Sequence, residues 1–119
     1  MKEGYLLLKK HLEKGSKIYL PVDPDCDGFG SAAIAFLYLK EYNKDIEIIP
    51  HIPDGKEHGL STIMEWFPDY GDENLIFVID SSSNDYEEHK LLKERGYEIL
   101  CCDHHETDRY SENAVVINN

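Results

Sequence analysis

The run LIFVI at residues 75–79, followed directly by Asp80, is the stretch that decides the fold. Five consecutive apolar residues are typical of a strand that is covered on both faces, as in the centre of a parallel sheet. Such a strand needs helices on either side of it. We therefore take residues 75–79 as the central strand and place the other elements around it.

Helices and strands alternate on both sides of this central run. The expected strands are residues 17–22, 46–49, 75–79, 98–102 and 114–117. The expected helices are residues 2–14, 32–42, 60–67 and 84–95, the last with a capping-box-like pair of Asn84 and Glu87. This order predicts an α/β fold with a mainly parallel five-stranded sheet and helices on both faces.

The charge of the chain limits how it can meet a polyanion. Its formal net charge is −12, whereas nucleic-acid binding relies on Lys and Arg against phosphate. Either the domain binds no polyanion, or its carboxylates hold cations that invert the local field. In the second case a separate basic region would hold the polyanion.

Length, cysteine content and hydropathy place the chain in a broad class. The 119 residues suit one small domain. Cys26, Cys101 and Cys102 form no CxxC motif, so neither a disulfide framework nor a structural zinc site is expected. No run approaches the length of a membrane span, and no signal peptide is recognisable at the N-terminus. A soluble protein of the cytoplasm is the expectation.

Acidic and imidazole side chains follow three of the expected strands. Asp23, Asp25 and Asp27 come after the first strand, Asp80 ends the central one, and residues 103–105 (Asp-His-His) follow the fourth. In an open parallel sheet, ligands bind outside the carboxyl ends of the strands. The three segments are therefore expected to meet at one edge.

These residue types suit a metal site. Asp25 and Asp27, in a loop expected over residues 23–31, would point to one side of an extended backbone and repel each other unless a cation sits between them. Oxygen ligands with imidazole suit Mn²⁺, Mg²⁺ or Zn²⁺, and oxygen-rich sites favour the first two. Two such ions, bridged by Asp80, can act on a phosphate. Gly28 and Gly30 would let the backbone approach an anion at the following helix N-terminus. Taken alone, residues 23–27 also fit a solvated turn.

Together these motifs resemble those of the DHH phosphoesterases. The triplet at residues 103–105 is similar to the one that names the family. The DPDCDG stretch at residues 23–28 resembles its first motif, and Asp80 at the end of an apolar strand resembles its second. Residues 52–60 are similar to a stretch of RecJ-type members. The resemblance covers residues 17–119 and implies a Rossmann-like DHH domain.

The resemblance also implies roles for individual residues. It implies these metal ligands: Asp25, Asp27, Asp80 and His104. It implies these catalytic residues: Asp80, Asp103, His104 and His105. It implies these substrate-binding residues: Gly28, Gly30, Ser31 and His105. Asp23 would support the ligands from behind, and the cofactor would be Mn²⁺ or Mg²⁺, with two ions in the complete protein.

The implied activity is metal-dependent hydrolysis of phosphodiester bonds, as a RecJ-like 5′–3′ exonuclease on single-stranded DNA in repair and recombination. One alternative is the same chemistry on short oligonucleotides or cyclic dinucleotides. Another is an inactive fragment or a non-catalytic DHH scaffold.

The chain departs from the family pattern at several points. Many members carry His where this chain has Pro21, and Ser81–Ser83 replace an Asn-Gly common in RecJ-type members. The family's further downstream Asp motif is absent from the sequence. We therefore expect residues 1–119 to be the N-terminal part of a DHH phosphoesterase domain, cut short and without the second DHH-associated domain.

The other histidines are not expected to take part in the metal site. His11, on the first helix, is predicted to be solvated, and His51 and His89 to be solvated or packed under loops. His58 is a weak candidate for a substrate contact.

Overall fold

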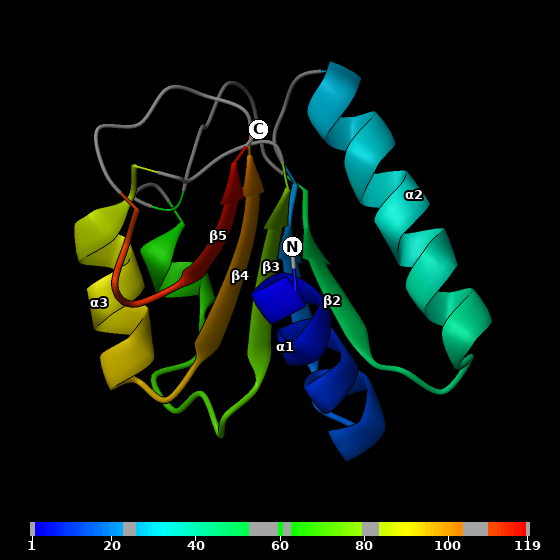
Figure 1. The fold of residues 1–119 in the computed structure, drawn as a ribbon, viewed down its shortest axis with the longest axis horizontal. Helices are drawn as coiled ribbons and strands as arrows, with labels where there is room; N and C mark the ends of the chain where they lie inside the picture. The colour runs from blue at the N-terminus through cyan, green and yellow to red at the C-terminus, as the bar shows by residue number, and fades with distance from the viewer. Residues whose placement is uncertain are drawn as a thin grey trace.

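The five strands form one parallel sheet in the order β2-β1-β3-β4-β5 (Figure 1). The structure, a computed structural model, describes residues 2–22, 26–52, 60, 63–79, 84–103 and 110–118, with the backbone alone for residues 2, 26–29 and 118. The strands are β1 (Ile18–Pro21), β2 (Ile48–His51), β3 (Leu75–Ile79), β4 (Glu98–Asp103) and β5 (Val115–Asn118). The helices are α1 (Lys2–Lys14), α2 (Cys26–Tyr42), the 3₁₀ helix η1 (Met64–Trp66) and α3 (Tyr86–Glu94).

The predicted α/β class, with a parallel sheet covered by helices on both faces, is confirmed. β3 is the central strand, flanked by β1 and β4, and Leu75, Ile76 and Val78 are almost fully buried. Each parallel pair keeps a regular register, for example Ile79 beside Cys102. The sheet is therefore the fixed frame on which the loops of the molecule are mounted.

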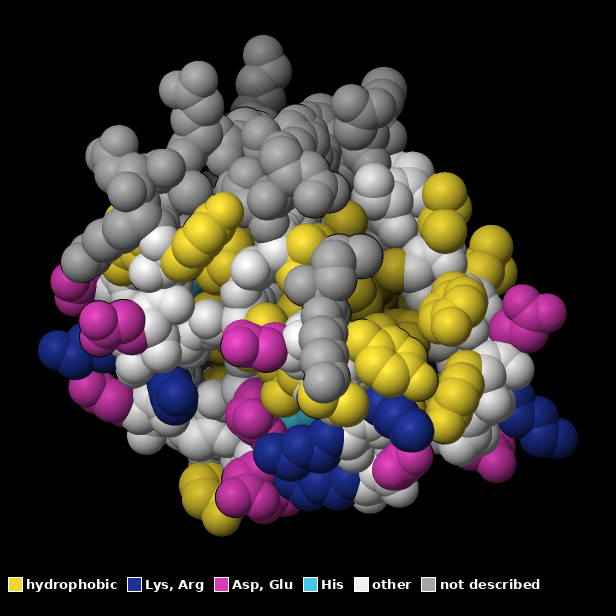
Figure 2. All heavy atoms as spheres, viewed as in Figure 1, with side chains coloured by type: hydrophobic (Ala, Val, Ile, Leu, Met, Phe, Trp, Pro, Cys, Tyr) yellow, Lys and Arg dark blue, Asp and Glu magenta, His cyan; other side chains and the backbone are white. Residues whose placement is uncertain are grey.

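Two apolar cores lie on the two faces of the sheet. On one face α1 and α2 cover the sheet, and Leu12 and Leu39 pack there against β1 and β3. On the other face η1 and α3 cover it, with Phe67 and Leu92 in the core. Figure 2 shows apolar side chains gathered over the outer side of α2 as well, where Tyr38 is among the exposed residues.

Two local predictions were wrong. The helix expected over residues 60–67 is reduced, among the described residues, to the single turn of η1, as expected for a helical pattern too short to sustain itself. The capping pair of Asn84 and Glu87 is replaced by Asp85 at the N-cap of α3, without a side-chain cap bond. The Asp85 carboxylate instead accepts a hydrogen bond from the Leu60 N–H at 2.9 Å, which ties this loop to the start of α3.

The prediction that His11 is solvated was also wrong. Its side chain is fully buried between α1 and β4. Its Nε2–H donates to Glu98 Oε1 at 3.0 Å, so the neutral ring accepts the Ser16 hydroxyl at Nδ1, 2.7 Å away. Burial lowers the pKa of His11, outweighing the attraction of Glu98. His89, expected on the surface or under a loop, is fully buried in α3.

No helix among the described residues is long and apolar enough to cross a lipid bilayer.

Candidate metal centre

The three strands that the predicted acidic segments follow or end in the sequence are neighbours in the sheet. β1, β3 and β4 are consecutive in the sheet, and their arrowheads point the same way in Figure 1. Adjacent strands are about 4.8 Å apart, so the three carboxyl ends lie within about 10 Å of each other. Asp80 is bonded to Ile79, which pairs with Cys102, the residue before Asp103. We call this end of the sheet the carboxyl edge.

The order in which strands are added to the sheet reverses beside β1. Such a reversal marks the ligand-binding position of open α/β sheets. From β1 the chain crosses to β2 on one side, and β3 then returns to the opposite side of β1. The order is the doubly wound 2-1-3-4-5, whose switch point lies between the first and third strands. Asp23 follows β1 and Asp80 follows β3, so the two acidic segments leave from either side of that point.

α2 begins earlier than the sequence suggested. The loop expected over residues 23–31 gives way to helix at Cys26, so Asp27, Gly28, Gly30 and Ser31 lie in its first turns. The argument that Asp25 and Asp27 share one side of an extended backbone is therefore wrong at Asp27. Glycines suggested a loop, but Asp is favoured at a helix start, where it meets the positive end of the dipole.

The start of α2 is open at the positions predicted to meet substrate. Gly30 is exposed, and a Cβ added there would meet no heavy atom within 4 Å. Ser31 is half-buried. Packing therefore does not require glycine at position 30. α2 begins at the carboxyl end of the sheet (Figure 1), and the amides in the first turn of a helix have no partner within the helix, an arrangement that favours anions.

Asp103 is the last residue of β4 rather than the first residue after it. Its Cα pairs with Asn118 of β5, and its side chain is only 8% exposed. Burial of a carboxylate is costly unless a cation or hydrogen bonds compensate. The neighbouring Cys102 is a free thiol whose pKa is raised by burial, so it stays protonated and is a poor metal ligand.

The remaining predicted residues, Asp23, Asp25, Asp80, His104 and His105, lie outside the described residues. Within the described part of the chain, no group of three or more His, Cys, Asp or Glu side chains is placed to hold a metal ion.

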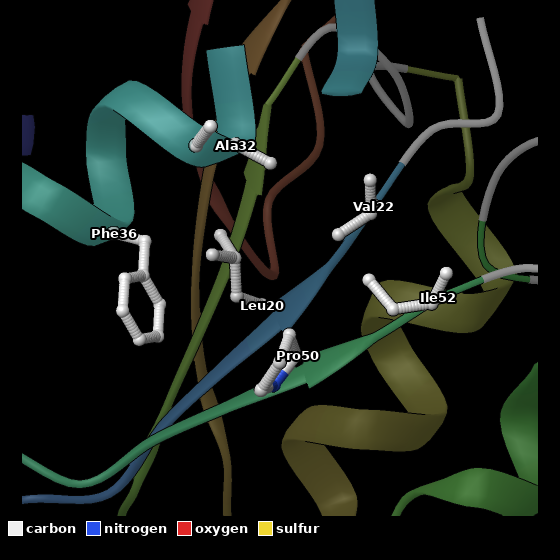
Figure 3. Close-up of a pocket in the computed structure, with 7 residues that line it drawn as sticks. Leu20, Val22, Ala32, Phe36, Pro50 and Ile52 are labelled. Carbon is white, nitrogen blue, oxygen red and sulfur yellow. The ribbon is translucent and has the colours of Figure 1, made fainter. Parts of the chain in front are cut away.

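An apolar cavity of about 210 Å³ borders the carboxyl edge between α2 and the outer strand pair. Figure 3 shows Val22 and Ile52, which follow β1 and β2, on one side of it and Phe36 of α2 on the other. Its lining is aliphatic and aromatic, so it offers no ligand for a metal ion. The chemistry of this edge therefore depends on the segments after β1, β3 and β4.

An aromatic pair on the opposite side of β2 was missed by the sequence reasoning. His51 ends β2, and its ring centroid lies 5.0 Å from that of Trp66 in η1. The alternation that sends Pro50 and Ile52 into the cavity turns His51 toward the other face. This alternation was the available signal, but the strand was expected to end at Ile49.

The chain is similar to known proteins over nearly its whole length. Residues 17–119 match the model of the DHH family, N-terminal domain. YorK, a prophage-derived protein of Bacillus subtilis named as a candidate single-strand DNA-specific exonuclease, is 41% identical over 112 residues, which are 94% of this chain and 19% of YorK. The single-stranded-DNA-specific exonuclease RecJ of Thermus thermophilus is 28% identical over 98% of this chain and 17% of its own length.

Solved structures match in the same way. The crystal structure of Thermus thermophilus RecJ in complex with Mn²⁺ gives a TM-score of 0.76 at 25% identity, covering 98% of this chain and 16% of that one. A manganese-bound exonuclease RecJ gives a TM-score of 0.80 at 24% identity, and the match covers 98% of this chain and 30% of that one. This second match supports the fold. The chain thus spans about a fifth of the curated relatives it matches.

Proposed function

Because the chain belongs to the DHH family, we propose that residues 1–119 are the N-terminal part of a DHH phosphoesterase domain that hydrolyses single-stranded DNA with divalent metal ions. The observation that supports this proposal is that β1, β3 and β4, the three strands that the acidic segments follow in the sequence, are parallel neighbours that include the switch point. The relatives named for single-strand DNA make that polymer the first substrate to test.

The donor set fits a hard divalent ion. Asp25, Asp27, Asp80 and His104 would hold the metal, and they offer three carboxylates and one imidazole, a combination that suits Mn²⁺ or Mg²⁺. Mn²⁺ is the ion present in the RecJ structures that share this fold. When bound, a pair of such ions lowers the pKa of water and neutralises charge on the phosphate.

The residues around the ligands have separable tasks in this proposal. The buried Asp103, held by the β4–β5 pairing, would orient the ligands or the attacking water with His105. A phosphate oxygen would bind at the start of α2. It would accept hydrogen bonds from backbone amides there, beside Gly28, Gly30 and Ser31. Asp23, directly after Val22, would hold the ligands in place.

The charge of the chain supports dependence on metal. At −12 the chain repels a polyanion, so cations at the carboxyl edge would supply the attraction that Lys and Arg provide in other nucleic-acid-binding domains. Metal binding and strand binding should therefore be coupled: removing the metal should abolish strand binding as well as hydrolysis.

Calorimetric titration of Mn²⁺ tests the site. The parent chain should bind with a defined stoichiometry, and Asp80→Asn should weaken binding by more than about 10-fold, as removal of groups around a metal does. The control is Asp45→Asn, which removes the same charge from an exposed position between α2 and β2. Equal affinity in all three chains would contradict the metal site.

Hydrolysis of a 3′-labelled single strand tests the activity and its polarity. With Mn²⁺, shortening from the 5′ end is expected for a single strand and not for a blunt duplex. Degradation that starts at the 3′ end, or release of products from dinucleotides alone, would redirect the proposal to another substrate. Metal binding without hydrolysis would contradict the activity of this chain.

A further inference from the structure

A row of aromatic rings runs through the core beside η1 and reaches the surface at the carboxyl edge. Tyr97 lies 5.5 Å from Tyr19, Tyr19 lies 5.7 Å from Trp66, and Trp66 lies 5.0 Å from His51, measured between ring centroids. Tyr97 and Tyr19 are buried, whereas Trp66 and His51 are half-buried. Core packing accounts for the first two rings and leaves the outer pair partly open to solvent.

The outer pair lies next to the candidate metal centre. His51 ends β2, and its Cα partner is Pro21, two residues before Asp23. β2 is the edge strand on that side of the sheet, so no further strand of the described sheet lies beyond the pair. A polymer whose phosphate sits at the ends of β1 and β3 would therefore pass within reach of these rings.

The pair is also held in place before any ligand arrives. The Arg95 guanidinium donates to the Met64 carbonyl at 3.0 Å and lies 3.5 Å from the Phe67 carbonyl, which fixes the turn that carries Trp66. Phe67 packs against Trp66 at 4.9 Å. Rings fixed in this way lose little conformational freedom when a flat ligand stacks on them.

We propose that His51 and Trp66 form a stacking surface for a nucleobase of the strand whose backbone is held at the metal centre. This rests on the proposed function and adds the group that the site would recognise beyond phosphate. Stacking on aromatic rings contributes about 1–3 kcal/mol per base and is tolerant of sequence. A chain of net charge −12 attracts the phosphate backbone only through the metal ions, so stacking would add affinity that does not depend on charge.

The single tryptophan of the chain makes the proposal directly measurable. Phosphorothioate oligothymidylate, which resists hydrolysis, would be titrated with Mn²⁺ present, and Trp66 fluorescence would be recorded together with the anisotropy of a label on the strand. An abasic strand of the same length and linkage is the matched ligand. Quenching and at least about 5-fold tighter binding are expected for the strand with bases, the lower limit of one stacking contact.

Variants separate stacking from packing. His51→Ala should remove most of the preference for the strand with bases, and His51→Phe, which keeps a ring, should restore it. Tyr70→Ala is the control, because Tyr70 is an exposed aromatic residue in the segment that precedes β3, and it should leave the preference unchanged. Far-ultraviolet circular dichroism reports whether each variant is folded, because Trp66 itself contacts the substituted position.

The outcomes distinguish the two proposals. Equal affinity for both strands, or a preference that survives His51→Ala, would overturn the stacking surface and leave the metal-dependent activity standing. Binding of neither strand while Mn²⁺ binds would contradict both strand recognition at the metal centre and the stacking surface. A preference that is lost in His51→Ala and kept in Tyr70→Ala is the supporting result.

Discussion

The two edges of the sheet are built for different purposes. We call the end at which the strands begin the amino edge. There, hydrogen bonds link the turns before β3 and β4: Gly71 N–H donates to the Arg95 carbonyl at 2.7 Å, and Tyr97 Oη donates to the Pro68 carbonyl at 2.8 Å. Burial, with Tyr19 beside it, raises the pKa of Tyr97 to about 12. At the carboxyl edge the acidic segments follow their strands in the sequence, and the described part of the chain there includes the buried Asp103 and the exposed Gly30. We therefore expect the proposed chemistry at this edge and a framework role for the contacts at the other.

This separation teaches how substitutions should behave. If the proposed carboxylate ligands lie close together, they repel one another in the absence of a cation, so we expect them to contribute little to the stability of the metal-free chain. Substitutions there should change function and spare stability. Substitutions at the amino edge should do the reverse, and each prediction below tests one side of this division.

Asp103→Asn should give the largest functional effect. The variant keeps the size of a side chain that is buried at the end of β4 but loses its charge, so Mn²⁺ affinity should fall by up to about 100-fold, as for partners of metal ligands. The free energy of unfolding without metal should change by only about 1 kcal/mol, because asparagine keeps the size of the side chain and an oxygen that can accept a hydrogen bond. Calorimetry and urea unfolding measure the two quantities. A large loss of stability with unchanged metal affinity would place Asp103 in the framework.

Gly71→Ala should give the largest structural effect. A Cβ at Gly71 would lie 2.8 Å from the backbone of both Gly96 and Tyr97, and Gly96 itself has a φ of +101°. Neither backbone segment can move without breaking the turns before β3 and β4, so a loss of about 2 kcal/mol is expected. Urea unfolding checks this, and the Mn²⁺ affinity of the folded variant should equal that of the parent. Unchanged stability would show that this edge is looser than its contacts indicate.

Much of this architecture could be predicted from the sequence because its signals are local. The apolar run at residues 75–79 and the alternation of elements were sufficient for the parallel sheet, and the expected strand end gave the position of Asp103 to within one residue. Asp80 lies outside the described residues, so its placement stays a prediction. The start of α2 was missed because Asp27 and Gly28 favour a loop and a helix N-terminus alike. His11 was missed because its partner, the half-buried Glu98, is 87 residues away, and no periodicity reports such a contact.

The buried His11 should make the amino edge sensitive to acid. Because the folded-state pKa of His11 is lowered, the unfolded chain takes up the proton first as pH falls below about 6.5. Stability should be constant above that value and decline toward the lower folded-state pKa. Burial alone would raise the pKa of Glu98, but its contacts with Lys10 and His11 lower it. The stabilisation that the Glu98 carboxylate contributes is therefore lost only at pH values below about 4.5.

His11→Asn isolates this effect. The variant should lose about 1 kcal/mol at pH 7 through its weaker hydrogen bonds, and its free energy of unfolding should no longer decline between pH 7 and 5.5 as steeply as that of the parent. Urea unfolding at a series of pH values gives both curves. Identical slopes would assign the acid sensitivity to other groups. Mn²⁺ affinity at pH 7 should not change, because His11 contacts Glu98 at the first residue of β4, whereas Asp103 is at the opposite end of that strand.

Gly30→Ala should give the smallest change and the most direct test of the open helix start. Gly30 lies inside α2, and a Cβ there would meet no atom within 4 Å, so alanine should stabilise the free chain by about 0.5–1 kcal/mol through helix propensity. If phosphate approaches the backbone here, the same methyl group should weaken strand binding while leaving Mn²⁺ affinity intact. Thermal unfolding and strand anisotropy provide the two measurements, with Ala33→Gly in the same helix as the reverse control for propensity. Greater stability with unchanged strand binding would place the phosphate elsewhere on the carboxyl edge, since the cost of the methyl group can come only from a ligand that occupies the space beside Gly30.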